Sequence, residues 1–297
     1  MNQPIILDGK LTAEAIRAQL KVEVAELVAA GILPCLAAIL VGDDPGSVSY
    51  VRGKELDCIE TGILDRFQRF PATFGESELL EQVDVLNADP TVHGILVQLP
   101  LPAHINEQKI IERIDPTKDV DGFHPINVGK MLLGLDCYLP CTPHGVIKML
   151  EFWKIETRGK HVVVCGRSNI VGKPMAVLLA RKGRFADATV TICHSKTVDL
   201  ARYTRDADIL VAAMGQAGFI KADMIKPGAV VIDVGVNRIA DSTRKSGTRL
   251  VGDVDYAGAC AVAGAITPVP GGVGLMTRAM LLHNTVQSAR RTLRDMH

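Results

Sequence analysis

The sequence predicts an α/β protein with two domains, each built on a parallel or mostly parallel sheet covered by helices. The chain has 297 residues, which is enough for two domains of ordinary size. Its hydrophobic content is 47% and its aromatic content is only 4%, so aliphatic residues must form the cores, as in buried parallel strands. Segments typical of strands and of helices alternate along the chain, as expected for this class.

The balance of charges and the use of cysteine limit the partners, the compartment and the metal sites that the sequence favours. Lys+Arg and Asp+Glu balance at 33 each, which argues against nucleic acid or an anionic membrane as the main partner. Apolar runs such as 229–234 are too short to span a bilayer, and we expect no secretory signal. The seven scattered cysteines favour reduced thiols in the cytoplasm. Cys137 and Cys141 resemble half of a zinc site, but no matching ligands follow, so we expect structural thiols and no metal.

The first half of the chain alternates between helix and strand. A helical apolar rhythm ends at Gly31, and strand-like and helix-like runs follow it. The expected elements are a helix over 11–30, strands over 35–41, 64–70 and 94–99, and a helix over 76–87.

The segment that follows the 35–41 strand carries the first candidate residues. The turn 43–46 precedes Ser47, which we expect to cap a helix that ends near Gly62. Tyr50 and Lys54 are four residues apart on this helix, so their side chains share one face. A buried lysine beside an aromatic ring can act as an acid, a base or a hydrogen-bond donor. A surface tyrosine and a solvated lysine are the alternative.

A second candidate lies at the end of the 94–99 strand. Two prolines, Pro100 and Pro102, force the chain out of the strand there. Gln98 offers a donor and an acceptor, which suits a heterocycle that presents both, although it could simply cap the strand end. Ligands of parallel sheets bind beyond the carboxyl ends of the strands, where Lys54 and Gln98 both fall.

The third stretch, 118–125, has Asp119 and Asp121 in a glycine-containing loop. Two aspartates could bind a metal, but no further oxygen ligands follow. A simpler interpretation is that one aspartate pairs with a lysine or binds the donor groups of a ring. His124 could be a general base, although a loop histidine before a proline is more often structural.

The second half of the chain predicts a Rossmann-like dinucleotide-binding domain. Thr142 is expected to cap a helix with Pro143 in its first turn, near the domain change. A β-branched strand over 160–165 then runs into a turn, and a helix continues to Ala180. This layout lets phosphate oxygens meet a helix N-terminus, although Gly166 and Gly172 are too far apart for the standard glycine fingerprint.

The next turn favours NADP over NAD. The 189–193 strand lacks the acidic residue that usually follows it to bind a free ribose hydroxyl. Ser195 and Lys196, with Arg167 and Ser168, would instead suit a 2′-phosphate.

Small residues and loops complete this domain. Strands are expected over 208–213 and 229–234, and small residues after them, such as Gly215, let a flat cofactor approach the backbone. A polar hairpin or loop is expected over 241–248. The Pro- and Gly-rich stretch 266–277 predicts a loop that is both a hinge and a wall of the site, before a last helix over 277–294.

Together these stretches closely resemble the methylenetetrahydrofolate dehydrogenase/methenyltetrahydrofolate cyclohydrolase family, over essentially the whole chain. The motifs that carry the resemblance are Tyr50-x-x-x-Lys54 and residues 94–102, 118–122, 166–168, 171–174 and 268–274. One departure is Leu275, where the family usually has proline, and it bears on the shape of that loop.

The resemblance implies a bifunctional enzyme that oxidises methylenetetrahydrofolate with NADP and hydrolyses the methenyl product to formyltetrahydrofolate. It implies that Lys54 is catalytic, that Tyr50 stacks on the folate ring, that Gln98 supports the lysine and that Asp121 holds the pterin. Further substrate-binding positions are Ser47, Leu99, Pro100, Pro270, Gly271 and Gly272. The implied cofactor-binding positions are Gly166, Arg167, Ser168, Ile170, Ser195, Gly215 and Val236.

The resemblance also implies a homodimer joined through the cofactor domains. A folate-binding catalytic domain is expected over 1–143 plus 276–297, an NADP-binding domain over 144–275, and the active-site cleft between them. Two alternatives stay open: dehydrogenase activity alone, and a dinucleotide- or folate-binding protein without turnover. Short-chain dehydrogenases share the Tyr-x-x-x-Lys spacing, but their glycine-rich turn precedes it in the chain, whereas here it follows.

Overall fold

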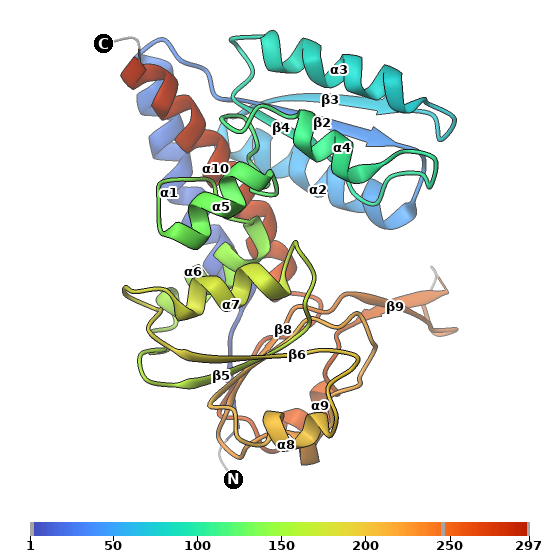
Figure 1. Ribbon diagram of the computed structural model, residues 1–297, viewed down its shortest axis with the longest axis vertical. Coiled ribbons are helices and arrows are strands. Elements are labelled where there is room, and N and C mark those ends of the chain that lie inside the picture. Colours follow the sequence, from blue (N-terminus) through green and yellow to red (C-terminus); the bar gives the residue numbers. More distant parts are fainter. Residues whose placement is uncertain (1–2, 245–246, 296–297) are drawn as a thin grey trace. The chain divides into compact units, whose positions relative to one another are not determined.

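The computed structural model describes residues 3–244 and 247–295, and Figure 1 traces them. The described residues pack into two compact units, and each is considered by itself. We call them the three-stranded unit, with residues 14–141 and those from 278 onward, and the six-stranded unit, with those up to 13 and those within 142–277. The α/β class predicted from the sequence is confirmed in both.

The three-stranded unit is built on a fully parallel sheet in the order β3-β2-β4. Its strands are β2 (Cys35–Val41), β3 (Leu64–Phe70) and β4 (Gly94–Val97). Every residue of the central strand β2 is buried, because helices cover both faces of the sheet. The helices with residues in this unit are α1 (Gly9–Ala29), α2 (Pro45–Thr61), α3 (Glu76–Ala88), α4 (Glu107–Arg113), α5 (Pro125–Leu133) and α10 (Val273–Asp295).

One cluster of buried apolar side chains packs α3 and α4 against one face of this sheet. Side chains of β2 and β4 that point to one face pack with Leu79, Val83 and Leu86 of α3 and with Ile110 of α4. Helix α2 lies against the other face of the sheet (Figure 1). This arrangement carries the start of α2 to the carboxyl end of β2, where the chain turns back.

Helix α2 ends where the sequence predicts but begins earlier. Gly62 closes it in the left-handed conformation, with φ of 81°. The expected cap, Ser47, is wrong: the helix starts at Pro45, and the Asp44 carboxylate accepts a hydrogen bond of 2.8 Å from the Ser47 backbone N–H. Aspartate caps helices at least as well as serine, and the proline favours the first helical position.

The six-stranded unit has a parallel sheet in the order β1-β11-β8-β7-β5-β6. Its strands are β1 (Ile5–Ile6), β5 (His161–Cys165), β6 (Thr189–Cys193), β7 (Ile209–Ala212), β8 (Val230–Asp233) and β11 (Ala265–Ile266). From β5 the chain moves to β6 on one side and then to β7 on the other. The strand order therefore reverses between β5 and β7, and a crevice forms at such a point in Rossmann-like sheets.

Short elements connect these strands. They are α6 (Cys141–Phe152), α7 (Gly172–Ala180), α8 (Leu200–Thr204), the 3₁₀ helix η1 (Ala222–Met224) and α9 (Tyr256–Cys260), with an antiparallel hairpin of β9 (Asn237–Ala240) and β10 (Thr248–Val251). Residues 241–247 of the polar stretch connect the two strands of this hairpin, and Thr248 begins β10. Residues 245–246 lie outside the described residues.

Two local predictions in this half are wrong. Helix α6 begins at Cys141, so Thr142 lies inside it rather than capping it, and its hydroxyl lies 2.8 Å from that of Thr277. The Pro- and Gly-rich loop is shorter than expected, because α10 already begins at Val273 and contains Leu275. In both cases the helix begins before the residue at which local signals place its start.

The N-terminal segment packs with the six-stranded unit. Strand β1 pairs with β11 at the edge of that sheet, through Ile5 with Ala265 and Ile6 with Ile266. The domain boundaries inferred from the sequence concern function as well as packing, and they stay a prediction. Within the described residues, the helices are too short or too polar to cross a membrane.

Candidate active site

The side chain of Lys54 lies among the predicted catalytic residues of the three-stranded unit. It is buried, with 4% of its surface exposed. Its Nζ donates a hydrogen bond of 2.9 Å to Gln98 Oε1 and lies 4.5 Å from the centre of the Tyr50 ring. The tyrosine and lysine share a face of α2, as their spacing predicts, and the glutamine follows β4. The structure thus brings three of the predicted catalytic residues together.

Gln98 is held so that its oxygen faces the lysine. Its backbone N–H donates to the Ile39 carbonyl of β2 at 2.8 Å, and its side-chain amide donates to the Leu99 carbonyl at 2.7 Å. An amide nitrogen that is engaged on one side leaves the amide oxygen to accept on the other. Gln98 is therefore a fixed acceptor for the Lys54 ammonium.

Burial makes Lys54 easier to deprotonate than an ordinary lysine. Loss of hydration lowers the pKa of Lys54 to about 8, and the nearby Asp121 carboxylate partly offsets this by favouring the charged form. Burial likewise raises the pKa of Asp121, whereas Lys54 and the Cys141 thiol lower it. A lysine with a pKa near 8 can exchange a proton at neutral pH.

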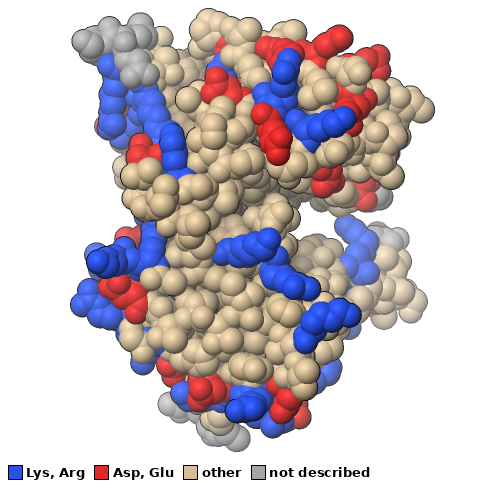
Figure 2. Space-filling model, in the orientation of Figure 1, with Lys and Arg blue, Asp and Glu red and all other residues tan. Residues whose placement is uncertain are grey.

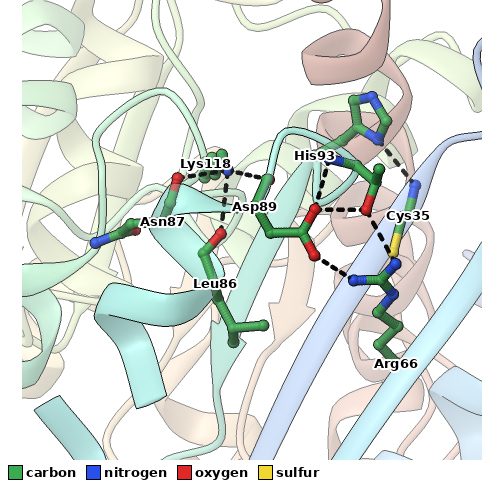
Figure 3. A network of polar contacts seen from close by, with 8 residues as sticks. Cys35, Arg66, Leu86, Asn87, Asp89, His93 and Lys118 are labelled. Carbon is green, nitrogen blue, oxygen red and sulfur yellow. Dashed lines mark hydrogen bonds and ion pairs between the residues drawn. The ribbon is translucent and has the colours of Figure 1, made fainter. Parts of the chain in front are cut away.

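The loop that carries Asp121 is anchored by its first residue. Lys118 Nζ donates to the carbonyls of Leu86, Asn87 and Asp89 at 3.1, 2.7 and 2.7 Å, at the end of α3 (Figure 3). A lysine placed there satisfies carbonyls that the helix end leaves without partners. The loop that follows is thereby fixed beside β4.

The two aspartates of this loop have different environments. Asp119 accepts hydrogen bonds from the backbone of Phe123 and His124 and from Asn127 Nδ2, so it shapes the loop. Asp121 instead acts on Lys54. His124 caps α5 by accepting a hydrogen bond of 3.1 Å from Ile126, which is a structural use. Within the described ranges, no three His, Cys, Asp or Glu residues are placed to hold a metal.

Two residues near Asp121 were not identified from the sequence. Cys141 Sγ donates to the Val120 carbonyl at 3.3 Å, and Asn284 Nδ2 donates to the same carbonyl at 2.8 Å. The sequence indicated only a structural thiol at 141. No sequence signal could have linked residue 284 to this loop, because the two lie 164 residues apart in the chain.

The remaining predicted substrate residues fall in two places. Ser47 is buried at the start of α2, Leu99 is half-buried and Pro100 is exposed, all in the three-stranded unit. Pro270, Gly271 and Gly272 belong to the six-stranded unit, where the Gly271 carbonyl accepts a hydrogen bond of 2.9 Å from the Gly9 backbone.

Most of the predicted cofactor residues lie along one edge of the six-stranded sheet. Gly166, Ser195 and Gly215 follow β5, β6 and β7, and Val236 follows β8. These are four neighbouring strands whose carboxyl ends meet at this edge. Gly166 has φ of 146°, and a Cβ there would overlap the Ala213 carbonyl oxygen, so the turns after β5 and β7 approach closely only without a side chain.

The turn between β5 and α7 suits an anionic group. Ser168 Oγ accepts hydrogen bonds from the backbone of Val171 and Gly172 at 3.1 and 3.3 Å, which orders the turn. Arg167 and Ile170 are exposed on it. Lys173 and Lys196 are also exposed, and Figure 2 shows Lys and Arg side chains over the part of this unit that carries α7. These residues fit a dinucleotide with an additional phosphate.

Comparison with known families decides the identification. Residues 7–121 match the catalytic domain of the tetrahydrofolate dehydrogenase/cyclohydrolase family, and residues 140–293 match its NAD(P)-binding domain. The chain belongs to this family. The resemblance read from the sequence is therefore confirmed, and the two matched domains correspond to a catalytic part and a cofactor-binding part.

Individual members of the tetrahydrofolate dehydrogenase/cyclohydrolase family are similar over nearly their whole length. The "Bifunctional protein FolD" of Exiguobacterium sp. is 58% identical over 97% of this chain and 99% of its own, and that of Bacillus subtilis is 57% identical over 97% and 98%. The bifunctional FolD structure from Campylobacter jejuni has a TM-score of 0.90 at 49% identity, covering 96% of this chain and 98% of its own. The Trypanosoma brucei FolD, complexed with NADP cofactor and inhibitor, has a TM-score of 0.94 at 41% identity, covering 99% and 100%.

The pKa of Lys54 can be tested directly. In NMR titrations of protein with labelled lysines, we expect one lysine, absent from Lys54→Met, to titrate with a pKa near 8. Since Asp121 favours the charged form, Asp121→Asn should lower this pKa further. A Lys54 pKa of about 10.4, the ordinary value of a lysine side chain, or a higher Lys54 pKa in Asp121→Asn, would contradict the proposed electrostatics.

Proposed function

We infer that the chain is a bifunctional enzyme that oxidises methylenetetrahydrofolate with NADP and hydrolyses the methenyl product to formyltetrahydrofolate. The observation that carries this function is the buried Lys54, held by Gln98 beside Tyr50 and Asp121, in a chain that matches bifunctional relatives over nearly its full length. A lysine so held is suited to proton transfer, which the hydrolytic step needs and a binding protein does not.

The residues of the three-stranded unit would bind and orient the folate. Tyr50 would stack on the folate ring, Asp121 would accept hydrogen bonds from the pterin, and Gln98 would keep Lys54 in place. Ser47, Leu99 and Pro100 would complete the contacts of this unit with the substrate, and Pro270, Gly271 and Gly272 are the proposed substrate residues of the six-stranded unit. NADP, when bound, supplies the hydride acceptor, and lone pairs of the substrate nitrogens drive hydride loss, so the protein contributes mainly alignment.

Lys54 would serve the hydrolytic step. Water adds to the cationic methenyl carbon and releases a proton, and a ring C–N bond then breaks as the nitrogen takes a proton up. Lys54 in its neutral form can accept the first proton and return one to the nitrogen. A cationic substrate close to Lys54 would lower its pKa further and so favour that neutral form.

Replacement of Lys54 tests this assignment. With methylenetetrahydrofolate and NADP, wild-type protein should form reduced cofactor and a methenyl product that decays faster than without enzyme, both followed optically. In Lys54→Met we expect methenyl hydrolysis to fall about 100-fold or more, with cofactor binding retained, because proton transfer is lost. Lys21→Met, an exposed lysine of α1 in the same unit, is the control.

The outcomes separate the alternatives. Full hydrolysis by Lys54→Met would refute its catalytic role. Reduced cofactor with a persistent methenyl product in the wild type would leave a dehydrogenase alone, and no reduction with NADP or NAD would favour a binding protein without turnover.

The proposed NADP contacts come from the turns that follow β5, β6, β7 and β8. Gly166, Gly215 and Val236 would approach the dinucleotide through their backbone, with Ile170 beside it. Arg167, Ser168 and Ser195 would bind the 2′-phosphate and phosphate groups. The folate-binding catalytic domain would comprise residues 1–143 plus 276–297, and the NADP-binding domain residues 144–275.

The 2′-phosphate contact makes a selective prediction. Arg167→Ala should raise the KM for NADP about tenfold, the loss expected for one charge-assisted hydrogen bond, and leave the KM for NAD nearly unchanged. The exposed Lys182→Ala, beyond the far end of α7, should change neither. Equal losses for both cofactors would place Arg167 elsewhere than at the 2′-phosphate.

The assembly we propose is a homodimer joined through the cofactor domains, in the cytoplasm. The cysteines in the described part of the chain form no disulfide with one another, which agrees with a reducing compartment. Light scattering on the eluting protein should give twice the chain mass of 31.9 kDa. A monomeric mass at micromolar concentration would contradict the dimer.

A further inference from the structure

Two buried carboxylates lie behind the predicted cofactor loops of the six-stranded unit. Asp253 is 0% exposed and Asp233 is 3% exposed. Asp233 is the last residue of β8, and Asp253 follows β10. Neither contributes to the site around Lys54, and the sequence assigned neither a role.

The Asp253 carboxylate accepts four hydrogen bonds from two separate segments. Oδ2 accepts from the backbone N–H groups of Met214 and Gly215 at 2.5 and 2.9 Å, and Oδ1 accepts from that of Gln216 at 2.8 Å. Oδ1 also accepts from Asn237 Nδ2 at 2.9 Å. Four bonds fill the usual accepting capacity of a carboxylate. The loop after β7 and the start of β9 are thus held by one side chain.

Asp233 in turn fixes the position of Asp253. Its Oδ1 accepts from the backbone N–H groups of Gly235 and Asp253 at 3.0 and 2.9 Å, and its Oδ2 accepts from that of Val254 at 2.9 Å. The segments after β7, β8 and β10 are therefore linked in series through two carboxylates. A buried carboxylate is stable only with such donors around it.

Two glycines make room for this network. A Cβ at Gly235 would overlap the Asp253 carboxylate, and one at Gly252 would overlap the Asp233 carboxylate. The backbone can surround the two carboxylates closely only because both positions lack a side chain. The sequence thus has the acids, the glycines and Asn237 in the places that the network requires.

We propose that Asp253 is a positioning residue for NADP. This inference rests on the proposed function, because Gly215 and Val236, two of the proposed cofactor contacts, lie in the loops that Asp253 and Asp233 hold. Three consecutive N–H groups bound to one carboxylate leave the 214–216 loop little conformational freedom. A loop ordered before binding does not have to lose that freedom when the cofactor binds, so affinity rises. Asn237 extends this order from the loop after β7 to the one after β8.

The test compares cofactor affinity with folding. In Asp253→Asn one acceptor oxygen becomes a donor, which faces backbone N–H groups, so the loop loses at least one of its bonds. We expect the Kd of NADP, measured by calorimetry, to rise about tenfold or more, and the KM for NADP to rise with it while the KM for the folate substrate stays the same. Asp255→Asn, an equal loss of charge two residues away on a partly exposed side chain, should leave the Kd unchanged.

A second variant covers the case in which Asp253→Asn does not fold. Asn237→Ala removes only one donor to Asp253 and should raise the Kd of NADP about threefold in a protein that melts close to the wild-type temperature. Wild-type Kd values in every folded variant would overturn the positioning role, as would equal rises in the KM for cofactor and for folate. If the wild-type protein itself bound no NADP, the proposed function would fail, and with it this inference.

Discussion

A buried ammonium is the constraint on which the three-stranded unit depends. Taking Lys54 out of water is unfavourable, and the surrounding groups offset that cost only together: the Gln98 oxygen, the face of the Tyr50 ring and the Asp121 carboxylate. Each comes from a different part of the chain. Helix α2, the end of β4 and the 118–122 loop must therefore all be in place before Lys54 can be buried with a pKa close to neutral pH.

The two units order their loops by the same physical means. In the three-stranded unit, Lys118 donates to three backbone carbonyls and fixes the loop that carries Asp121. In the six-stranded unit, Asp253 accepts from three backbone N–H groups and fixes the loop after β7. The charges are opposite, but in both cases one side chain satisfies a series of backbone groups that no helix or sheet satisfies. The backbone groups of irregular segments beside a site are thereby satisfied by hydrogen bonds.

The family assignment and the structure explain different things. The comparisons establish what kind of chain this is, over both of its domains. The geometry adds a group suited to the proton transfer that we propose for the hydrolytic step. This group is a lysine whose pKa is lowered to about 8 by burial, with an aspartate that keeps the pKa from falling further. The geometry also distinguishes Asp119, which shapes its loop, from Asp121, although only one residue lies between them.

The sequence by itself determined the α/β class, the strands over 35–41, 64–70 and 189–193, and the pairing of Tyr50 with Lys54, because hydrophobic period and helical spacing are local properties. It misjudged the helix starts near Ser47 and Thr142, since Asp44 caps the first helix and the second begins at Cys141. Only the tertiary structure decided that β1 joins the six-stranded sheet, that Asn284 reaches the Val120 carbonyl, and that Asp253 holds residues 214–216. Those contacts join distant parts of the chain, and the free energy that selects them comes from burial and hydrogen bonding in the complete fold.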